Sequence, residues 1–153
     1  MLYILEGCDG VGKSTLSWEL QPILDAKVIH CTSQTPNDMK FFHDIIEASR
    51  LTNIIADRFM YGQFVYQDER HRPLSIKQLG YLEAEALSAG VKLIHVRADE
   101  AVIEQRLSLR GETLINNLTI EQVVQRFVEV FTKQSILKPI EWWTDISDWR
   151  MRK

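Results

Sequence analysis

The chain has 153 residues, a length that suits one domain with a substantial core and leaves no room for two comfortable ones. Hydrophobic residues make up 45% and charged residues 25%, a composition that excludes a disordered protein. A formal net charge of −3 excludes broad attraction to nucleic acid or to anionic membranes and favours a small-molecule substrate. Cys8 and Cys31 have no metal-ligand spacing, and the apolar residues 1–5 are too few to cross a bilayer. We therefore expect a cytoplasmic protein with reduced thiols and no membrane partner.

Apolar patterning along the chain predicts alternating strands and helices. Short apolar runs predict strands at Leu2–Leu5, Val28–Ile29, Asn53–Ala56 and Val91–Val96. Helical spacing of apolar residues predicts helices over 13–25, 38–49, 75–89 and 99–109. A further helix is expected from Thr119, since Gln122 follows it at the spacing of a capping box. This alternation predicts an α/β fold with a parallel sheet of about five strands, helices around it, and ligands at the carboxyl ends of the strands.

A glycine-rich motif follows the first predicted strand and reads Gly7-Cys8-Asp9-Gly10-Val11-Gly12-Lys13-Ser14. It matches the Gly-x-x-x-x-Gly-Lys-Ser pattern of a P-loop and lies between a strand and a helix, as phosphate binding requires. Its three glycines, at 7, 10 and 12, let backbone N–H groups converge on an anion at a helix N-terminus. Lys13 would reach the outer phosphates of ATP, and Ser14 would ligate Mg²⁺. The motif predicts a three-layer α/β/α P-loop NTPase domain over residues 1–153.

Other P-loop classes fit the sequence less well. A switch GTPase needs an Asn-Lys-x-Asp motif to read its base, and the chain contains none. A larger ATPase motor needs more chain than this and a strand that ends in an acidic pair. The sequence therefore disfavours both classes.

A second motif follows the third predicted strand and reads Ala56-Asp57-Arg58-Phe59-Met60-Tyr61-Gly62-Gln63-Phe64-Val65-Tyr66-Gln67. Together with residues 6–15, it resembles the thymidylate kinase family, whose P-loop has the form Glu-Gly-x-Asp-Gly-x-Gly-Lys-Ser/Thr-Thr. That family follows its third strand with Asp-Arg-Tyr and an Ala-Tyr-Gln-like stretch at the same spacing. The resemblance is specific in these two segments and diffuse elsewhere. It implies a short, divergent nucleoside monophosphate kinase, such as a virus could encode, with Thr15 among its ATP-binding residues.

The resemblance also implies roles for the charged residues of both motifs. Asp9 would face the acceptor nucleoside and the metal region, and Asp57 would hold Mg²⁺ through water. Arg58 would grip the acceptor phosphate, and a guanidinium at a strand end can do so in bidentate fashion. Without a P-loop beside them, Asp57 and Arg58 would fit a surface salt bridge equally well.

The acceptor pocket and the lid are the remaining parts of the expected site. By resemblance, Gln63 would lie against the base and Tyr66 beside the sugar, while Phe41 or Phe42 would supply an aromatic ring that stacks on the base. Arg106 and Arg110 lie four residues apart on one predicted helix face, like the arginines at the edge of a nucleotide kinase lid. They would cover ATP from a short lid near 106–118 and stabilise the migrating phosphoryl charge. A solvated stripe that pairs with nearby glutamates is the alternative for these two arginines.

Several other residues suggest no function by themselves. The histidines share no metal-ligand spacing, and His95 within an apolar strand is typical of a core residue; the four are His30, His43, His71 and His95. Arg97 and Arg126 are secondary candidates for phosphate binding. The tryptophans near the end of the chain are expected to seal the last sheet edge or to pack against a partner; they are Trp142, Trp143 and Trp149.

Three functions remain open at this point. The first is a deoxynucleoside monophosphate kinase that transfers the γ-phosphoryl group of Mg-ATP to a nucleotide phosphate. The second is a kinase with a hydroxyl acceptor, such as a nucleoside or a hydroxymethyl pyrimidine in DNA, for which Asp9 or Asp57 would serve as general base. The third is a nucleotide-binding module with little turnover. A homodimer through apolar helix faces is compatible with each, and nucleic acid is a partner only in the second.

Overall fold

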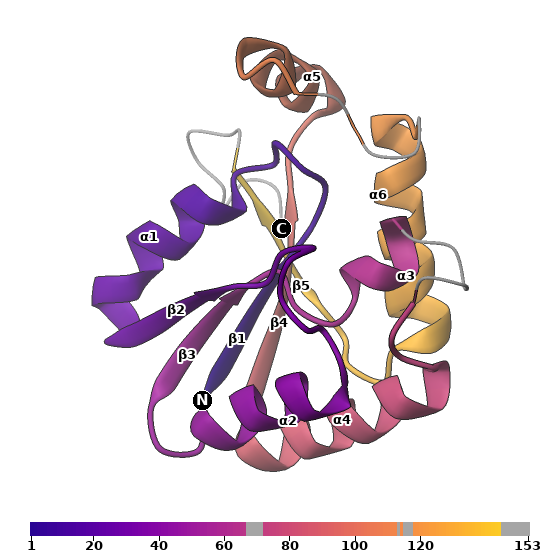
Figure 1. Cartoon of the computed structure of the whole chain (residues 1–153). Helices are drawn as coiled ribbons and strands as arrows, with labels where there is room; N and C mark the ends of the chain where they lie inside the picture. The colour runs from indigo at the N-terminus through magenta and orange to yellow at the C-terminus, as the bar shows by residue number, and fades with distance from the viewer. Residues whose placement is uncertain (67–71, 113, 115–117, 145–153) are drawn as a thin grey trace.

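The computed structural model describes residues 1–66, 72–112, 114 and 118–144, and its core is a parallel β-sheet (Figure 1). The strands are β1 (Leu2–Glu6), β2 (Ala26–His30), β3 (Asn53–Asp57), β4 (Val91–Arg97) and β5 (Ile140–Trp143). Their order across the sheet is β2-β3-β1-β4-β5, and every neighbouring pair is parallel. The predicted five-stranded parallel α/β fold is thus confirmed. The carboxyl ends of the strands meet at one edge, where β1 runs into the P-loop.

Helices cover both faces of this sheet. They are α1 (Lys13–Leu24), α2 (Met39–Ala48), α3 (Gly62–Tyr66), α4 (Ile76–Ala89), α5 (Glu100–Leu109) and α6 (Ile120–Glu129), which continues into the π-helical turn η3 (Val130–Gln134). Helix α1 packs against β1, β2 and β3, while α2 packs beside α4 on the other side of the sheet (Figure 1). Helix α6 contacts both α3 and α5. The three layers place α1, α3 and α5 around the carboxyl edge of the sheet.

Local sequence signals explain where several of these helices begin. Ser75 and Gln78 form a complete capping box at the start of α4, and Thr119 and Gln122 form another at the start of α6. The Asp38 side chain accepts a hydrogen bond from the backbone N–H of Phe41 at the start of α2. The predicted starts of these helices agree with the structure to within one residue, because caps act on the residues next to them.

The short elements differ most from the sequence prediction. Strand β2 is longer than the predicted Val28–Ile29, and α3 was not predicted as a helix. Strand β5 was not predicted either, although the two tryptophans expected at the last sheet edge, Trp142 and Trp143, belong to it. Its first residue, Ile140, is 54% exposed, so this edge strand lacks the continuous apolar run of a central strand. Trp149, His71 and residues 113 and 115–117 of the expected lid lie outside the described residues.

No helix in the described ranges is long and apolar enough to cross a membrane.

Candidate active site

The P-loop bends tightly around the carboxyl end of β1. Gly10 and Gly12 adopt φ angles of 83° and 103°, in the left-handed region that favours glycine. Gly7 leaves no room for a side chain, because a Cβ there would lie 2.4 Å from the backbone carbonyl oxygen of Val96 on β4. The loop therefore needs its glycines both for its turns and for its close approach to the sheet.

The close approach at Gly7 gives a testable prediction for stability. We expect Gly7→Ala to lower the free energy of unfolding by about 2 kcal/mol, the usual cost of overpacking against rigid backbone. Gly80→Ala on α4 is the matched control, since no described atom lies within 4 Å of an added Cβ there. Alanine should raise stability at that helical position by about 1 kcal/mol. Urea unfolding measures both changes, and unaltered stability of Gly7→Ala would mean that the loop relaxes without strain.

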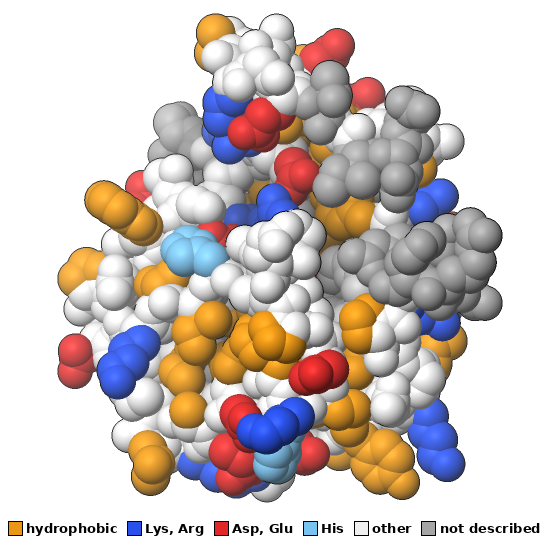
Figure 2. Space-filling view, in the orientation of Figure 1, with side chains coloured by type: hydrophobic (Ala, Val, Ile, Leu, Met, Phe, Trp, Pro, Cys, Tyr) orange, Lys and Arg blue, Asp and Glu red, His pale blue; other side chains and the backbone are white. Residues whose placement is uncertain are grey.

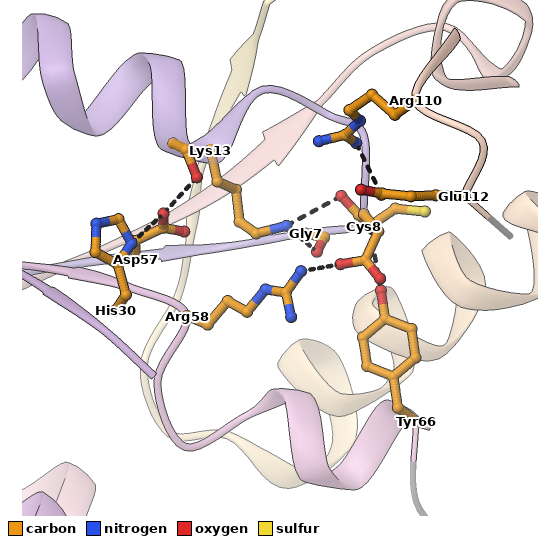
Figure 3. A network of polar contacts seen from close by, with 11 residues as sticks. Gly7, Cys8, Lys13, His30, Asp57, Arg58, Tyr66, Arg110 and Glu112 are labelled. Atoms are coloured by element: carbon orange, nitrogen blue, oxygen red, sulfur yellow. Dashed lines mark hydrogen bonds and ion pairs between the residues drawn. The ribbon is translucent and has the colours of Figure 1, made fainter. Parts of the chain in front are cut away.

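Lys13 lies under the loop and points into it (Figure 3). Its side chain is buried, and Nζ donates hydrogen bonds to the carbonyl oxygens of Gly7 at 2.7 Å and Cys8 at 3.0 Å. Burial lowers the pKa of this ammonium group, and the positive charge of Arg58 lowers it further. An anion in the loop would offer Nζ stronger acceptors than the two neutral carbonyl groups, so Lys13 is held where it can bind phosphate.

Ser14, Asp57 and His30 form a compact polar group at the ends of α1, β3 and β2. Ser14 Oγ donates to Asp57 Oδ2 at 2.7 Å, and His30 Nδ1 lies 2.9 Å from the same carboxylate oxygen. Asp57 is buried, and His30 is its register partner on the neighbouring strand. A hydroxyl and a carboxylate in contact beside a phosphate loop are the hard oxygen donors that Mg²⁺ prefers, so Ser14 and Asp57 fit a magnesium site. His30 was not predicted as a site residue, although its position directly after the predicted strand Val28–Ile29 was a usable signal.

Arg58 crosses from the end of β3 to the P-loop. Its φ angle is 66°, a left-handed conformation that costs a non-glycine residue on the order of 1 kcal/mol, and its N–H donates to Leu5 O at 3.0 Å. The guanidinium forms an ion pair with the Asp9 carboxylate. The backbone N–H of Asp9 donates to the hydroxyl of Tyr66 at 3.3 Å. The predicted acceptor residues Asp9, Arg58 and Tyr66 thus form one connected group.

The two predicted lid arginines lie at the end of α5 in different environments. Arg106 Nη1 donates to the carbonyl oxygens of Gly10 and Val11 at 3.3 and 3.0 Å, and to Thr144 Oγ1 at 3.2 Å. Arg110 is half exposed and lies 3.5 Å from Glu112. Thr144, directly after β5, also donates to the Val11 carbonyl oxygen and so attaches the last strand to the P-loop. No sequence pattern indicated Thr144, because its partner is 133 residues away.

These groups surround one open cavity of about 1000 Å³ at the carboxyl edge of the sheet. Blue Lys and Arg side chains and red Asp and Glu side chains both lie around the hollow in the upper half of Figure 2. The cavity brings together most of the predicted phosphate, metal and lid residues; those lining it are Asp9, Gly10, Gly12, Lys13, Ser14, Thr15, Asp57, Arg58, Arg106 and Arg110. His30, Cys31, Trp142, Trp143 and Thr144 line it as well. Its volume suits a nucleotide, and Lys13 with the three lining arginines offers positive charge to phosphates at the P-loop.

The predicted base-binding residues do not line this cavity. Phe42 is fully buried and packs edge-on against Phe41 and Phe59, so the expectation that it stacks on a base was wrong: its ring has no free face. Gln63 is 8% exposed, and its Oε1 accepts from the backbone N–H of Leu74 at 3.0 Å. Tyr66 packs edge-on against Phe127 in the core. Roles for Phe41, Gln63 and Tyr66 beside a base or sugar stay predictions.

Burial controls the protonation of several groups near the loop. It raises the pKa of the Cys8 thiol to about 11 and that of Cys31 to about 12, so both remain thiols at neutral pH. It lowers the pKa of His95 to about 4, and this neutral ring packs against Phe127 and Phe131, which confirms it as a core residue. The two arginines predicted as secondary phosphate ligands have structural partners. Arg97 stacks on Trp143, and Arg126 donates to the Val65 carbonyl oxygen.

The chain matches no family model. It is 29% identical over 140 residues to the SPbeta prophage-derived uncharacterized protein YorR of Bacillus subtilis strain 168, a match that covers 88% of this chain and 84% of YorR. A crystal structure of YorR in complex with phosphorylated GDP superposes with a TM-score of 0.74 at 28% identity, over 94% of this chain and 85% of that one.

Two solved kinases have the same fold at lower sequence identity. Deoxyadenosine kinase from M. mycoides with bound dCTP has a TM-score of 0.57 at 20% identity, over 95% of this chain and 90% of that one. A gluconokinase from Sinorhizobium meliloti 1021 has a TM-score of 0.54 at 12% identity, over 95% and 82% of the two chains. The sheet order, the P-loop geometry and these neighbours agree: the chain has the α/β fold of the P-loop kinases.

Proposed function

We propose that this chain is an ATP-dependent phosphotransferase that transfers the γ-phosphoryl group of Mg-ATP to the phosphate of a nucleotide, as a deoxynucleoside monophosphate kinase does. One observation carries the proposal: Lys13, the Ser14–Asp57 pair and Arg58 line a single cavity. Phosphoryl transfer depends on positioning and on charge neutralisation more than on covalent chemistry. A lysine, a metal-binding pair and an arginine around one space supply both.

The donor half of the site would hold the triphosphate. The loop N–H groups and Lys13 would bind the outer phosphates, and Ser14 and Asp57 would hold magnesium, which when bound neutralises charge on those phosphates. Arg106 contacts the loop through the Gly10 and Val11 carbonyl oxygens, so its guanidinium lies beside the place where the phosphates would bind. Its positive charge would stabilise the negative charge that develops during transfer.

The acceptor half would centre on Arg58. The Arg58 side chain is 44% exposed and its guanidinium is paired with Asp9, so an acceptor phosphate would compete with that carboxylate for the same donors. A phosphate oxygen is already deprotonated and attacks without a general base. The thymidylate kinase resemblance of the Asp57-Arg58 segment supports this choice of acceptor. The nucleotide bound in the YorR structure, and the dCMP and dCDP bound in a deoxyadenosine kinase structure, support a nucleotide in the cavity.

A hydroxyl acceptor is the second candidate, and the carboxylates favour it. Asp9 and Asp57 both line the cavity, and a hydroxyl acceptor must lose its proton to such a base. The name of the structurally similar deoxyadenosine kinase denotes a nucleoside acceptor. Either a nucleoside or a modified pyrimidine in DNA could supply the hydroxyl acceptor.

ADP release with a panel of acceptors distinguishes the two candidates. The protein is incubated with Mg-ATP and, separately, with deoxynucleosides, deoxynucleoside monophosphates and DNA that contains hydroxymethyl pyrimidines. We expect a monophosphate to raise ADP release above the ATP-only background. Background release with every monophosphate, together with stimulation by a hydroxyl substrate, would replace the first proposal by the second. Background release with every acceptor would contradict both.

A further inference from the structure

Glu6 is a buried carboxylate directly before the P-loop, and the phosphate-binding motif does not account for it. It ends β1, is 1% exposed and does not line the cavity. Placing an acid in the interior costs free energy unless hydrogen bonds and opposite charges compensate it. The contacts of this carboxylate therefore indicate what it does.

The hydrogen bonds of Glu6 lead to the turn that carries Arg58. Oε2 accepts from the backbone N–H of Tyr61 at 2.9 Å, and the nearby backbone N–H of Phe59 acts on the same carboxyl and lowers its pKa. Both donors belong to the turn that follows β3 and begins with the left-handed conformation of Arg58. On its far side, the hydroxyl of Tyr61 donates to buried Glu83 at 2.8 Å. Two buried carboxylates thus fix this turn, one through its backbone and one through a side chain.

The ionised and the protonated forms of Glu6 interact differently with the charged groups around it. Burial raises its pKa from 4.5 to about 7, against the opposing effects of the Lys13 and Arg58 charges. The other titratable groups that act on it, the Cys31 thiol and the Tyr61 phenol, have raised pKa values and are neutral at that pH. His95, its register partner on β4, is neutral there too. Ionised Glu6 offers acceptors to both N–H groups and attracts Arg58, whereas the protonated acid loses one acceptor and its charge.

We propose that Glu6 is a positioning residue for Arg58: its ionised carboxylate holds the turn 58–61 and thereby directs the Arg58 guanidinium toward the acceptor phosphate. The inference rests on the proposed function for the identity of the acceptor. Loss of the charge should loosen the turn on the acceptor side, while Lys13 keeps its bonds to the loop carbonyls. Glu6 would therefore affect acceptor binding more than ATP binding.

Glu6→Gln tests this role through the pH dependence of acceptor binding. In the wild type we expect kcat/KM for the acceptor nucleotide to rise through pH about 7 as Glu6 ionises. In Glu6→Gln the component of the pH profile near pH 7 should vanish. Only the rise caused by the second ionisation of the acceptor phosphate, with a pKa of about 6, should remain. At pH 8 the KM for the acceptor should rise about tenfold, as expected when one hydrogen bond to a charged group is lost, with the KM for ATP changed less than about twofold. The same pH profile in both proteins, or an equal rise in both KM values, would overturn the proposal.

Glu83→Gln is the matched control, because Glu83 is also a fully buried carboxylate attached to Tyr61. It should lower stability while leaving the component near pH 7 in place. If Glu6→Gln does not fold, Glu6→Asp replaces it: the shorter acid still titrates, so the pH dependence should persist with a raised KM for the acceptor. Loss of the pH 7 component in Glu83→Gln would mean that any damage to the turn removes it, which would overturn the role of Glu6.

Unfolding measurements test the titration of Glu6 without any activity. The ionised carboxylate holds the turn locally, but the cost of burying its charge outweighs these contacts in the free energy of unfolding, and its folded pKa is therefore raised above the unfolded value of 4.5. The stabilisation from its bound proton is complete below pH 4.5 and is lost as the pH rises through about 7. Relative to Glu6→Gln, the wild-type unfolding equilibrium should shift toward the unfolded state by at least roughly tenfold between these pH values. Parallel stabilities would overturn the proposal even if the kinase activity is confirmed. A wild type that releases no ADP with any acceptor would contradict the proposed function instead.

Discussion

Lys13→Ala should lower kcat for ADP release by a factor of roughly 10²–10³ with every acceptor, the usual cost of removing a preorganised donor from a transition-state site. The physical reason is the position of Nζ, which lies 2.7 and 3.0 Å from two loop carbonyl oxygens inside the turn where phosphates would bind. Alanine leaves the backbone N–H groups but removes the only side-chain charge that the P-loop motif provides for the outer phosphates. Steady-state ADP release at saturating Mg-ATP measures the change.

Lys40→Ala is the control for this experiment, because Lys40 is an exposed lysine that pairs with Asp44 on α2, away from the cavity. It should leave kcat unchanged. Lys13→Ala should fold normally, since burial disfavours the charge that it removes, and thermal unfolding checks this point. A folded Lys13→Ala variant with wild-type turnover would remove the P-loop lysine from the reaction.

Much of the fold could be predicted from the sequence because its signals are local. The central strands are short apolar runs, and β1 and β3 are buried as such runs require. Capping boxes at Ser75 and Thr119 mark two helix starts. Strand β5 could not be found in this way, because it is a four-residue edge strand whose first two residues are exposed. Its place in the sheet depends on pairing with β4, which no local pattern encodes.

In the candidate site, too, the residues with local sequence signals were predicted and those that depend on distant partners were not. The P-loop and Asp57-Arg58 are contiguous motifs, and the structure brings them to one cavity as their positions after strands predict. Glu6 and Thr144 were not predicted because their partners are 55 and 133 residues away in the chain. His30 was missed although its position directly after a predicted strand was a local signal. Phe42 was predictable as a core residue, since it shares the apolar face of α2 with Ile45 and Ile46 and all three are buried. Family resemblance gave it a role that its own helix pattern argued against.

Arg58→Ala should raise the KM for a phosphate-bearing acceptor by roughly 100-fold and leave the KM for ATP within about twofold, because charge-assisted hydrogen bonds to one substrate are lost. The guanidinium is paired with Asp9 at the cavity wall, whereas Arg106 donates to Thr144. Arg58→Lys should recover only part of the affinity, since an ammonium group cannot bind phosphate in bidentate fashion. KM values for both substrates, measured by ADP release, give the comparison.

Arg50→Ala is the matched control for Arg58, because Arg50 is a comparably exposed arginine that pairs with Glu47 away from the cavity. It should change neither KM. An unchanged acceptor KM in Arg58→Ala would remove this residue from the acceptor site. If the active acceptor proves to be a hydroxyl compound, the effects should reverse: Arg58→Ala would alter its KM little, while Asp9→Asn or Asp57→Asn would lower kcat by removing the general base. Arg58 therefore separates the two candidate reactions, because a phosphate acceptor needs its charge and a hydroxyl acceptor needs a carboxylate.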